Sequence, residues 1–161
     1  MTEVLRRFIE KNIELIEQNN FDQLYKNCNS LEERGKLTEA LYSAGILVLE
    51  NLEWKIPEFM FFKNNIQEII IPDNIHVIDQ GAFLGCQKLT KVVIPASVTM
   101  IHFGVFNQCS NLTEIFYEGT SEQLFNIRAD GFPFAKPIEV IHCTDKDVAF
   151  EEYWLRYSAT N

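Results

Sequence analysis

The chain has 161 residues, 47% of them apolar and 23% charged, which predicts one globular domain, with or without an attached segment, and a core that needs no disulfides. Its formal net charge of -9 disfavours binding to nucleic acid or to an anionic membrane, because phosphate groups require a basic surface. The sequence contains no run of about 18 apolar residues, so we expect nothing to span a bilayer.

The first residues, MTEVLRRFIEKNIELIEQ, carry charges throughout and lack the apolar stretch of a secretory signal. We therefore expect a cytoplasmic protein of a bacterial or phage-infected cell. In that compartment the four cysteines are expected to be reduced thiols, and none has the C-x-x-C spacing of a zinc or redox motif. They are Cys28, Cys86, Cys109 and Cys143.

Residues 1–55 are predicted to form a helical N-terminal cap. A first helix near 3–18 is predicted by apolar residues at helical spacing, which are Leu5, Phe8, Ile9, Ile13 and Ile16. A second, short helix is indicated by Phe21, Leu24, Tyr25 and Cys28. Ser30 and Glu33 have the pattern of a capping box that opens a third helix, and Gly45 fits its end.

The middle of the chain repeats itself at an offset of 23 residues. Residues 66–87 read IQEIIIPDNIHVIDQGAFLGCQ, and residues 89–110 read LTKVVIPASVTMIHFGVFNQCS. A half unit precedes these two complete units, and a decaying unit follows them. Each complete unit has a short apolar run closed by a proline, which cannot donate to a strand ladder. The pattern predicts strands near 67–71, 90–94 and 113–117.

One such unit cannot bury its own apolar face, whereas stacked units share a continuous core. The sequence therefore predicts a solenoid in which equivalent residues form ladders along the stack. We expect two of these ladders to be interior: Phe83 with Phe106, and Cys86 with Cys109.

The repeated units resemble the BspA-like leucine-rich repeats, whose pattern is IPxSVTxIGxxAFxxCxxLxxI. The similarity is close from Ile94 to Thr99 and in the pieces that end at Cys86 and Cys109. It covers roughly residues 56–147, because YEGTSEQLFNI resembles the family's terminal segment and VIHCTDKD its closing strand, expected near 138–143. The resemblance implies an α+β protein with a short, curved solenoid. Its parallel strands would line a concave face that binds proteins, and the family carries no catalytic residues to transfer.

Two features depart from the family pattern. His102 and Phe103 stand where the family usually has glycine and a polar residue. Asn64 stands where the ladder cysteine would be, so we expect the first unit to be distorted into a junction.

Residues 148–161 are predicted to form a C-terminal capping tail. Val148 and Phe150 fit a hairpin strand after a turn at 144–147. A helical face is also indicated, by Phe150, Tyr153, Trp154 and Tyr157. We favour a short strand followed by an irregular or helical end that covers the last rung; a helix over the whole segment is the alternative.

Side chains alternate along a strand, so the residues between the buried positions are expected to point outward. On the three predicted strands these outward positions form an apolar column beside a charged one. The predicted partner-binding residues of the concave face are Glu68, Ile70, Lys91, Val93, Glu114 and Phe116. An exposed apolar column rimmed by charge is typical of a protein-binding surface, although such residues also suit a sheet face that the helices or a loop cover.

No arrangement of residues predicts catalysis, so the chain is not expected to be an enzyme. His142 and Cys143 are neighbours on a predicted strand and point to opposite faces, which prevents them from forming a dyad. The three histidines lack metal-ligand spacing, and no glycine-rich phosphate loop occurs. We expect neither a metal site nor a cofactor.

Together these features predict a non-enzymatic module that binds a protein partner through the concave strand face. It would work as a monomer or a weak homo-oligomer. Two alternatives stay open. One is an acidic phage-type inhibitor or DNA mimic that acts on a nucleic-acid-binding host protein, and the other is a structural protein that self-associates.

Overall fold

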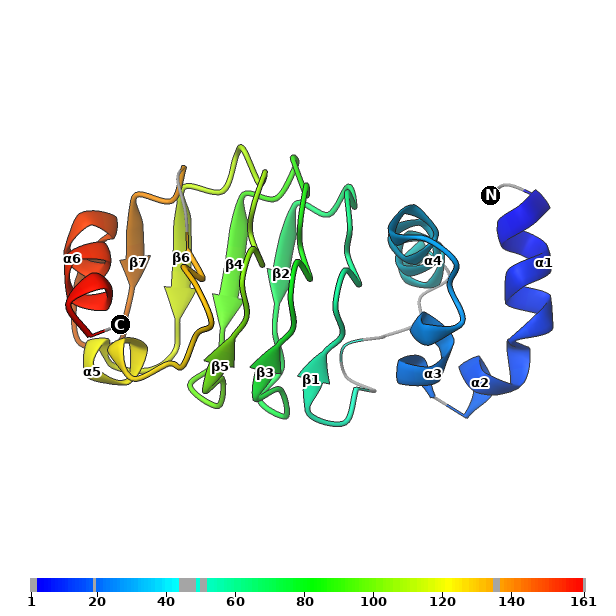
Figure 1. Cartoon of the computed structure of the whole chain (residues 1–161), viewed down its shortest axis with the longest axis horizontal. Coiled ribbons are helices and arrows are strands. Elements are labelled where there is room, and N and C mark those ends of the chain that lie inside the picture. The colour runs from blue at the N-terminus through cyan, green and yellow to red at the C-terminus, as the bar shows by residue number, and fades with distance from the viewer. Residues whose placement is uncertain (1–2, 19, 44–48, 50–51, 135–136, 161) are drawn as a thin grey trace.

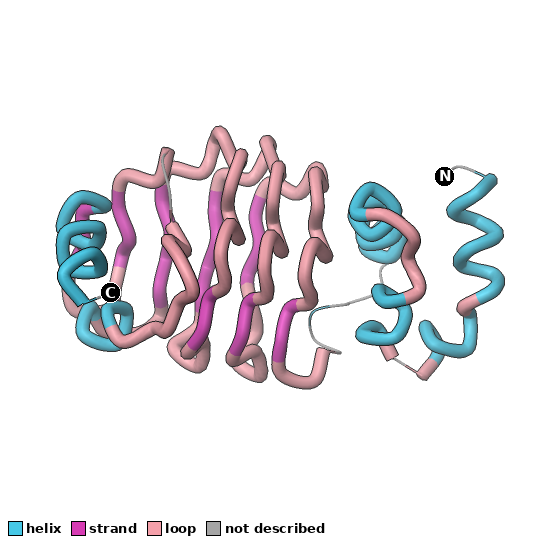
Figure 2. The backbone as a smooth tube through the Cα atoms, viewed as in Figure 1, coloured by secondary structure: helices cyan, strands magenta, loops and turns pink. Residues whose placement is uncertain are grey.

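The structure, a computed structural model, describes residues 3–18, 20–43, 49, 52–134 and 137–160. The molecule is elongated, with stacked rungs in its middle and helices at both ends (Figure 1). Each rung consists of short strands joined by loops (Figure 2). The predicted solenoid with a helical N-terminal cap is therefore confirmed.

The rungs form two sheets. The longer sheet has the order β2-β4-β6-β7-β8, and all its neighbours are parallel except β7 and β8. Its strands are Glu68–Ile70 (β2), Lys91–Ile94 (β4), Glu114–Tyr117 (β6), Val140–His142 (β7) and Asp147–Ala149 (β8). The shorter sheet is parallel, with the order β1-β3-β5. Its strands are Lys55–Ile56 (β1), Val77–Ile78 (β3) and Met100–Ile101 (β5).

The strands of the longer sheet lie where the repeat predicts them. Ile69, Val92 and Ile115 are paired in register and buried, since each is the central inward residue of its apolar run. Strand β7 confirms the expected closing strand near 138–143.

The shorter sheet is absent from the sequence predictions. Each of its strands has only two residues and contributes a single buried side chain to the core: Ile56, Ile78 and Ile101. Such a strand exists because successive rungs stack, and its own residues carry too short a pattern to reveal it.

The interior ladders are confirmed. Four phenylalanine rings stack along the solenoid, with centroid separations of 4.8, 5.5 and 6.2 Å. They are Phe61, Phe83, Phe106 and Phe134, and all are buried. Beside them, the Cys86 and Cys109 thiols donate to the carbonyl oxygens of Phe61 and Phe83, one rung earlier, at 3.0 and 3.1 Å.

The N-terminal cap contains helices α1 (Glu3–Lys11), α2 (Ile13–Glu17), α3 (Phe21–Lys26) and α4 (Leu31–Ser43). The prediction of one helix over 3–18 is wrong, because the helix is interrupted at Asn12. The Asn12 amide donates to the Phe8 carbonyl at 2.8 Å and its oxygen accepts from Asn27 at 2.8 Å, so the side chain competes with the helical ladder.

Only half of the predicted capping box forms at the start of α4. The Glu33 N–H donates to the Ser30 hydroxyl at 3.1 Å. The Glu33 carboxylate accepts from the backbone N–H of Asn29 at 2.6 Å, rather than from that of Ser30. The predicted helix end at Gly45 lies outside the described residues.

Helix α4 buries Leu37 and Leu41 in the common core and also contacts the first rung with polar side chains. The Arg34 guanidinium donates to the Glu58 carbonyl at 2.8 Å, and the Thr38 hydroxyl donates to the Met60 carbonyl at 2.6 Å. Along this segment the N–H groups of Phe59 and Phe61 donate to carbonyls of the next rung. The Glu58 and Met60 carbonyls therefore point the opposite way, toward the side where a preceding rung would lie. The helix therefore supplies donors in place of another rung.

Asn64 lies at this junction. Its amide donates to the Gly35 carbonyl at 3.2 Å, and its oxygen accepts from the Ile66 N–H at 3.1 Å. Helix and rung approach so closely that a Cβ atom on Gly35 would lie 2.0 Å from the Phe62 carbonyl oxygen. The junction thus depends on a glycine in the helix and an amide in the rung.

The C-terminal tail follows the favoured prediction. Strand β8 pairs with β7, and helix α6 (Phe150–Thr160) follows it directly, so the alternative of one helix over the whole segment is wrong. Helix α6 lies at the last rung beside the short helix α5 (Ser121–Phe125) (Figure 1). Tyr153 of α6 is buried against Phe125 and Phe134.

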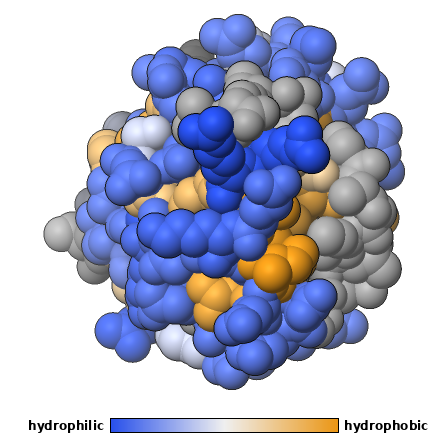
Figure 3. Space-filling view, turned by 90° about the vertical axis from the view of Figure 1, so that its right-hand side faces the viewer, coloured by the Kyte–Doolittle hydropathy of each residue, from blue (hydrophilic) through white to orange (hydrophobic). Residues whose placement is uncertain are grey.

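The opposite end of the molecule is seen in Figure 3. Its surface is largely hydrophilic around a small hydrophobic patch. None of the helices in the described part of the chain is long and apolar enough to cross a membrane.

Candidate binding face

The structure brings the six predicted residues together on one face of the longer sheet. Glu68, Lys91 and Glu114 are paired in register across β2, β4 and β6. The second column runs beside the first and consists of Ile70, Val93 and Phe116. We refer to these two columns as the strand face.

The strand face is open to solvent. Ile70 is 70% exposed, and Glu68 and Glu114 are also exposed. The other three side chains of the strand face are half-buried, as expected where neighbouring strands lie on both sides. They are Lys91, Val93 and Phe116. Among the described residues, neither the helices nor a loop buries the apolar column.

Phe116 is the centre of a cluster of side chains. The Lys91 ammonium lies 5.3 Å from the centroid of the Phe116 ring. On the neighbouring strand the His142 ring stacks on Phe116 with a centroid separation of 4.7 Å and an interplanar angle of 25°. A half-buried aromatic ring held by two neighbours presents a fixed apolar surface, and aromatic residues are enriched at the cores of protein interfaces.

His142 and Asp147 extend the strand face beyond the six predicted residues. The His142 Nδ1 atom lies 2.8 Å from the Asp147 carboxylate, and its Nε2 atom lies 3.8 Å from that of Glu114. Both residues are in register with Phe116 through β7 and β8. The repeat could not reveal them because it has decayed there, although the likeness of 140–147 to a closing strand was an available signal.

The strand face carries more negative than positive charge. Its carboxylates are Glu68, Glu114 and Asp147, and its ammonium group is Lys91. Lys91 is in register between two of these carboxylates, yet among the described residues its ammonium group pairs with neither and lies over the Phe116 ring. Within the described residues, the Glu68 carboxylate forms neither an ion pair nor a hydrogen bond.

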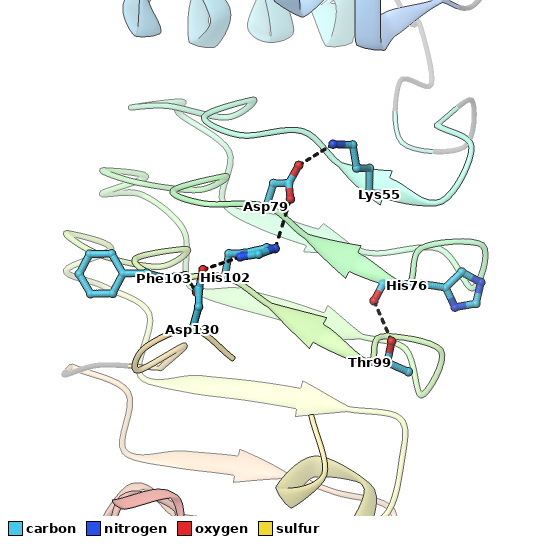
Figure 4. Close-up of polar contacts among 7 residues, drawn as sticks. All are labelled: Lys55, His76, Asp79, Thr99, His102, Phe103 and Asp130. Atoms are coloured by element: carbon cyan, nitrogen blue, oxygen red, sulfur yellow. Dashed lines mark hydrogen bonds and ion pairs between the residues drawn. The ribbon is translucent and has the colours of Figure 1, made fainter. Parts of the chain in front are cut away.

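A second cluster, unforeseen from the sequence, runs along the shorter sheet (Figure 4). The Lys55 ammonium lies 2.8 Å from the Asp79 carboxylate, whose other oxygen lies 3.6 Å from Nε2 of His102. The Nδ1 atom of His102 lies 2.7 Å from Asp130, whose second oxygen accepts from the Phe103 N–H at 2.7 Å. The cluster ties successive rungs together and explains why His102 departs from the family pattern.

This second cluster, of Lys55, Asp79, His102 and Asp130, borders an open cleft of about 460 Å³ between the cap and the first rungs. Its charged groups compensate one another, with Arg34 3.3 Å from Glu58 and Lys55 beside Asp79. The hydrogen bond from His102 lowers the pKa of Asp130, which stays ionised. The charged groups that line the cleft are therefore used in contacts within the protein. Their arrangement does not point to a particular class of ligand.

Cys28, Cys86 and Cys143 are free thiols in surroundings that disfavour the thiolate. Burial raises the pKa of Cys28 to about 12 and that of Cys143 to about 11. The hydrogen bond with Cys109, together with burial, raises the pKa of Cys86. Protonated thiols are weak nucleophiles. Among the described residues, no group of three histidine, cysteine or carboxylate side chains could hold a metal ion.

A stack of short parallel strands with buried aliphatic and phenylalanine ladders defines a small leucine-rich-repeat solenoid. The chain belongs to the BspA type leucine rich repeat region family, whose model matches residues 46–159 as 6 copies. Such repeats suggest a protein-interaction module and are typically non-enzymatic. The repeats thus continue into segments where the pattern seen in the two complete units has diverged.

One solved structure is similar to part of the chain. It is the crystal structure of a leucine rich cell surface protein from Faecalibacterium prausnitzii, at 35% sequence identity and a TM-score of 0.46. The similarity covers 48% of this chain and 21% of that chain, so this protein spans about a fifth of its length. No curated protein gives a match.

Proposed function

We propose that this protein binds a protein partner through the strand face and catalyses no reaction. The observation that carries the proposal is the exposed column of Ile70, Val93 and Phe116, held in register by the sheet and rimmed by charge. The sheet is preformed, so association would cost little ordering of the backbone. The family supports the proposal, because its repeats suggest an interaction module.

A matched pair of substitutions tests the face. Ile70 on β2 and Leu155 on α6 are each 70% exposed, so replacing either with aspartate makes the same chemical change at equal exposure. We expect Ile70→Asp to abolish recovery of partner proteins in an affinity pull-down with quantitative mass spectrometry, and Leu155→Asp to leave it intact. Circular dichroism checks that both variants fold. Equal recovery by wild type and Ile70→Asp would exclude the strand face.

We also propose that the protein works in the bacterial cytoplasm. Four free thiols support a reducing compartment. The similar structure from Faecalibacterium prausnitzii is described as that of a cell surface protein, so the two locations need a direct comparison. Cell fractionation with an antibody against this chain tests the proposal, and recovery in the cell-wall fraction would overturn it.

A further inference from the structure

We infer that the partner presents a segment in which apolar side chains are interspersed with lysine or arginine. This inference rests on the proposed function of the strand face and specifies the chemistry that this face selects. Three exposed carboxylates and one ammonium group border the apolar column, so the face favours cations beside an apolar anchor.

The geometry makes these carboxylates available to a partner. Lys91 is in register between Glu68 and Glu114, but its ammonium group lies over the Phe116 ring. Among the described residues, the Glu68 carboxylate has no side-chain partner, and the Glu114 carboxylate pairs with no lysine or arginine and lies 3.8 Å from the His142 ring nitrogen. Both carboxylates can therefore accept from a partner's cations without first losing a strong ion pair.

The carboxylates also flank the apolar positions at a useful spacing. Glu68 lies two residues before Ile70, and Glu114 two residues before Phe116, on the same side of their strands. Adjacent strands are about 4.8 Å apart, so one short segment crossing β2, β4 and β6 can reach both carboxylates and the column. The overall charge of -9 would in addition attract a cationic segment at long range.

Two synthetic peptides probe this chemistry. Both carry leucine at the same positions, and the intervening residues are lysine in one and glutamate in the other. Binding is measured by fluorescence anisotropy at about 0.15 M salt, where charges farther apart than about 8 Å are screened. We expect the lysine–leucine peptide to bind the wild type and the glutamate–leucine peptide to bind at least about tenfold more weakly.

Charge-reversal variants then separate the strand face from the net charge. Glu68→Lys with Glu114→Lys reverses the face, and Glu14→Lys with Glu17→Lys makes the same charge change on α2 of the cap. We expect the first double variant to lower affinity for the lysine–leucine peptide at least about tenfold and the second about twofold at most. All four residues are exposed, and circular dichroism confirms that both variants fold.

The outcomes separate the two proposals. Equal losses in both double variants, or no binding of the lysine–leucine peptide, would overturn the inferred partner chemistry. Equal binding of both peptides, with a loss on Ile70→Asp, would overturn the inference and leave the proposed function standing. Binding of the lysine–leucine peptide that is insensitive both to Ile70→Asp and to the face reversal would remove the strand face itself.

Discussion

Both ends of the solenoid bury apolar side chains, but they differ in the contacts that supplement this packing. At the N-terminal end, α4 meets the first rung with polar side chains that donate to backbone carbonyls, as Arg34 and Thr38 do. At the C-terminal end, α6 meets the last rung with aromatic rings, led by Tyr153. A solenoid end leaves both backbone hydrogen-bonding groups and an apolar ladder without a neighbour. The N-terminal helix bonds to the backbone groups, and the C-terminal helix packs on the end of the ladder.

The difference follows from what each end presents. In the segment of the first rung that faces α4, the N–H groups of Phe59 and Phe61 donate to the next rung, so the intervening carbonyl oxygens point toward the cap. The last strand of the stack is instead paired by β8, which turns back antiparallel against β7. With the strand edge paired, α6 has mainly to bury the end of the phenylalanine ladder at Phe134.

The largest expected effect is at the aromatic end. Tyr153 is 1% exposed and packs on Phe125 and Phe134 with centroid separations of 6.0 and 5.2 Å. Tyr153→Ala should lower the free energy of unfolding by about 3–5 kcal/mol, because it leaves a cavity at the end of the ladder. Urea denaturation measures the loss. Leu155→Ala on the same helix is the control and should cost about 0.5 kcal/mol at most.

A smaller effect is expected at the polar end. The Thr38 hydroxyl donates to the Met60 carbonyl and lies 2.6 Å from the hydroxyl of Tyr25. Thr38→Val keeps the shape and removes the hydroxyl that donates to the buried Met60 carbonyl, so it should cost about 1–3 kcal/mol. The same change at the exposed Thr90, whose hydroxyl donates to the Gln67 carbonyl, should cost much less. If urea denaturation shows the same loss of unfolding free energy for Thr38→Val and Thr90→Val, the buried bond to Met60 contributes no more than an exposed one.

The same contrast shows what could be predicted from the sequence. Strands β2, β4 and β6 were predictable because Ile69, Val92 and Ile115 repeat at a fixed offset, and stacking needs only that repetition. All six residues of the strand face followed from alternation along those strands. The aromatic cover was predictable from its helical spacing, although the exact strand-to-helix boundary was not.

The polar contacts were not predictable, because they join segments that share no period. Asn12 breaks the first helix through its bond to the Phe8 carbonyl and its contact with Asn27, fifteen residues later. Asp130 lies in a segment where the repeat pattern has diverged, so the only sign of its pairing with His102 was the histidine in place of a family glycine. Side chains that bond to backbone or to a distant charge leave no periodic pattern.

The smallest effect concerns the tie between the last two rungs, at Asp130. The hydrogen bond from His102 lowers the pKa of this carboxyl, so its folded state favours the charged form more than the unfolded chain does. The resulting stabilisation is present above the ordinary aspartate pKa of about 3.9 and is lost as pH falls through the lower, folded value. Its size should be about 0–1 kcal/mol, since the side chain is half exposed.

Asp130→Asn removes the charge and keeps an oxygen that can accept from the Phe103 N–H. The variant should be slightly less stable than the wild type at neutral pH, and the gap should close as the pH falls below about 4. Urea denaturation at a series of pH values measures it, and about 1 M salt should shrink the gap at neutral pH. A gap that persists at low pH would mean that Asp130 holds the last rung by shape and hydrogen bonding alone. The Asp130 contact would then add no charge-dependent stability, and its contrast with the Arg34 contact at the N-terminal end would be sharper.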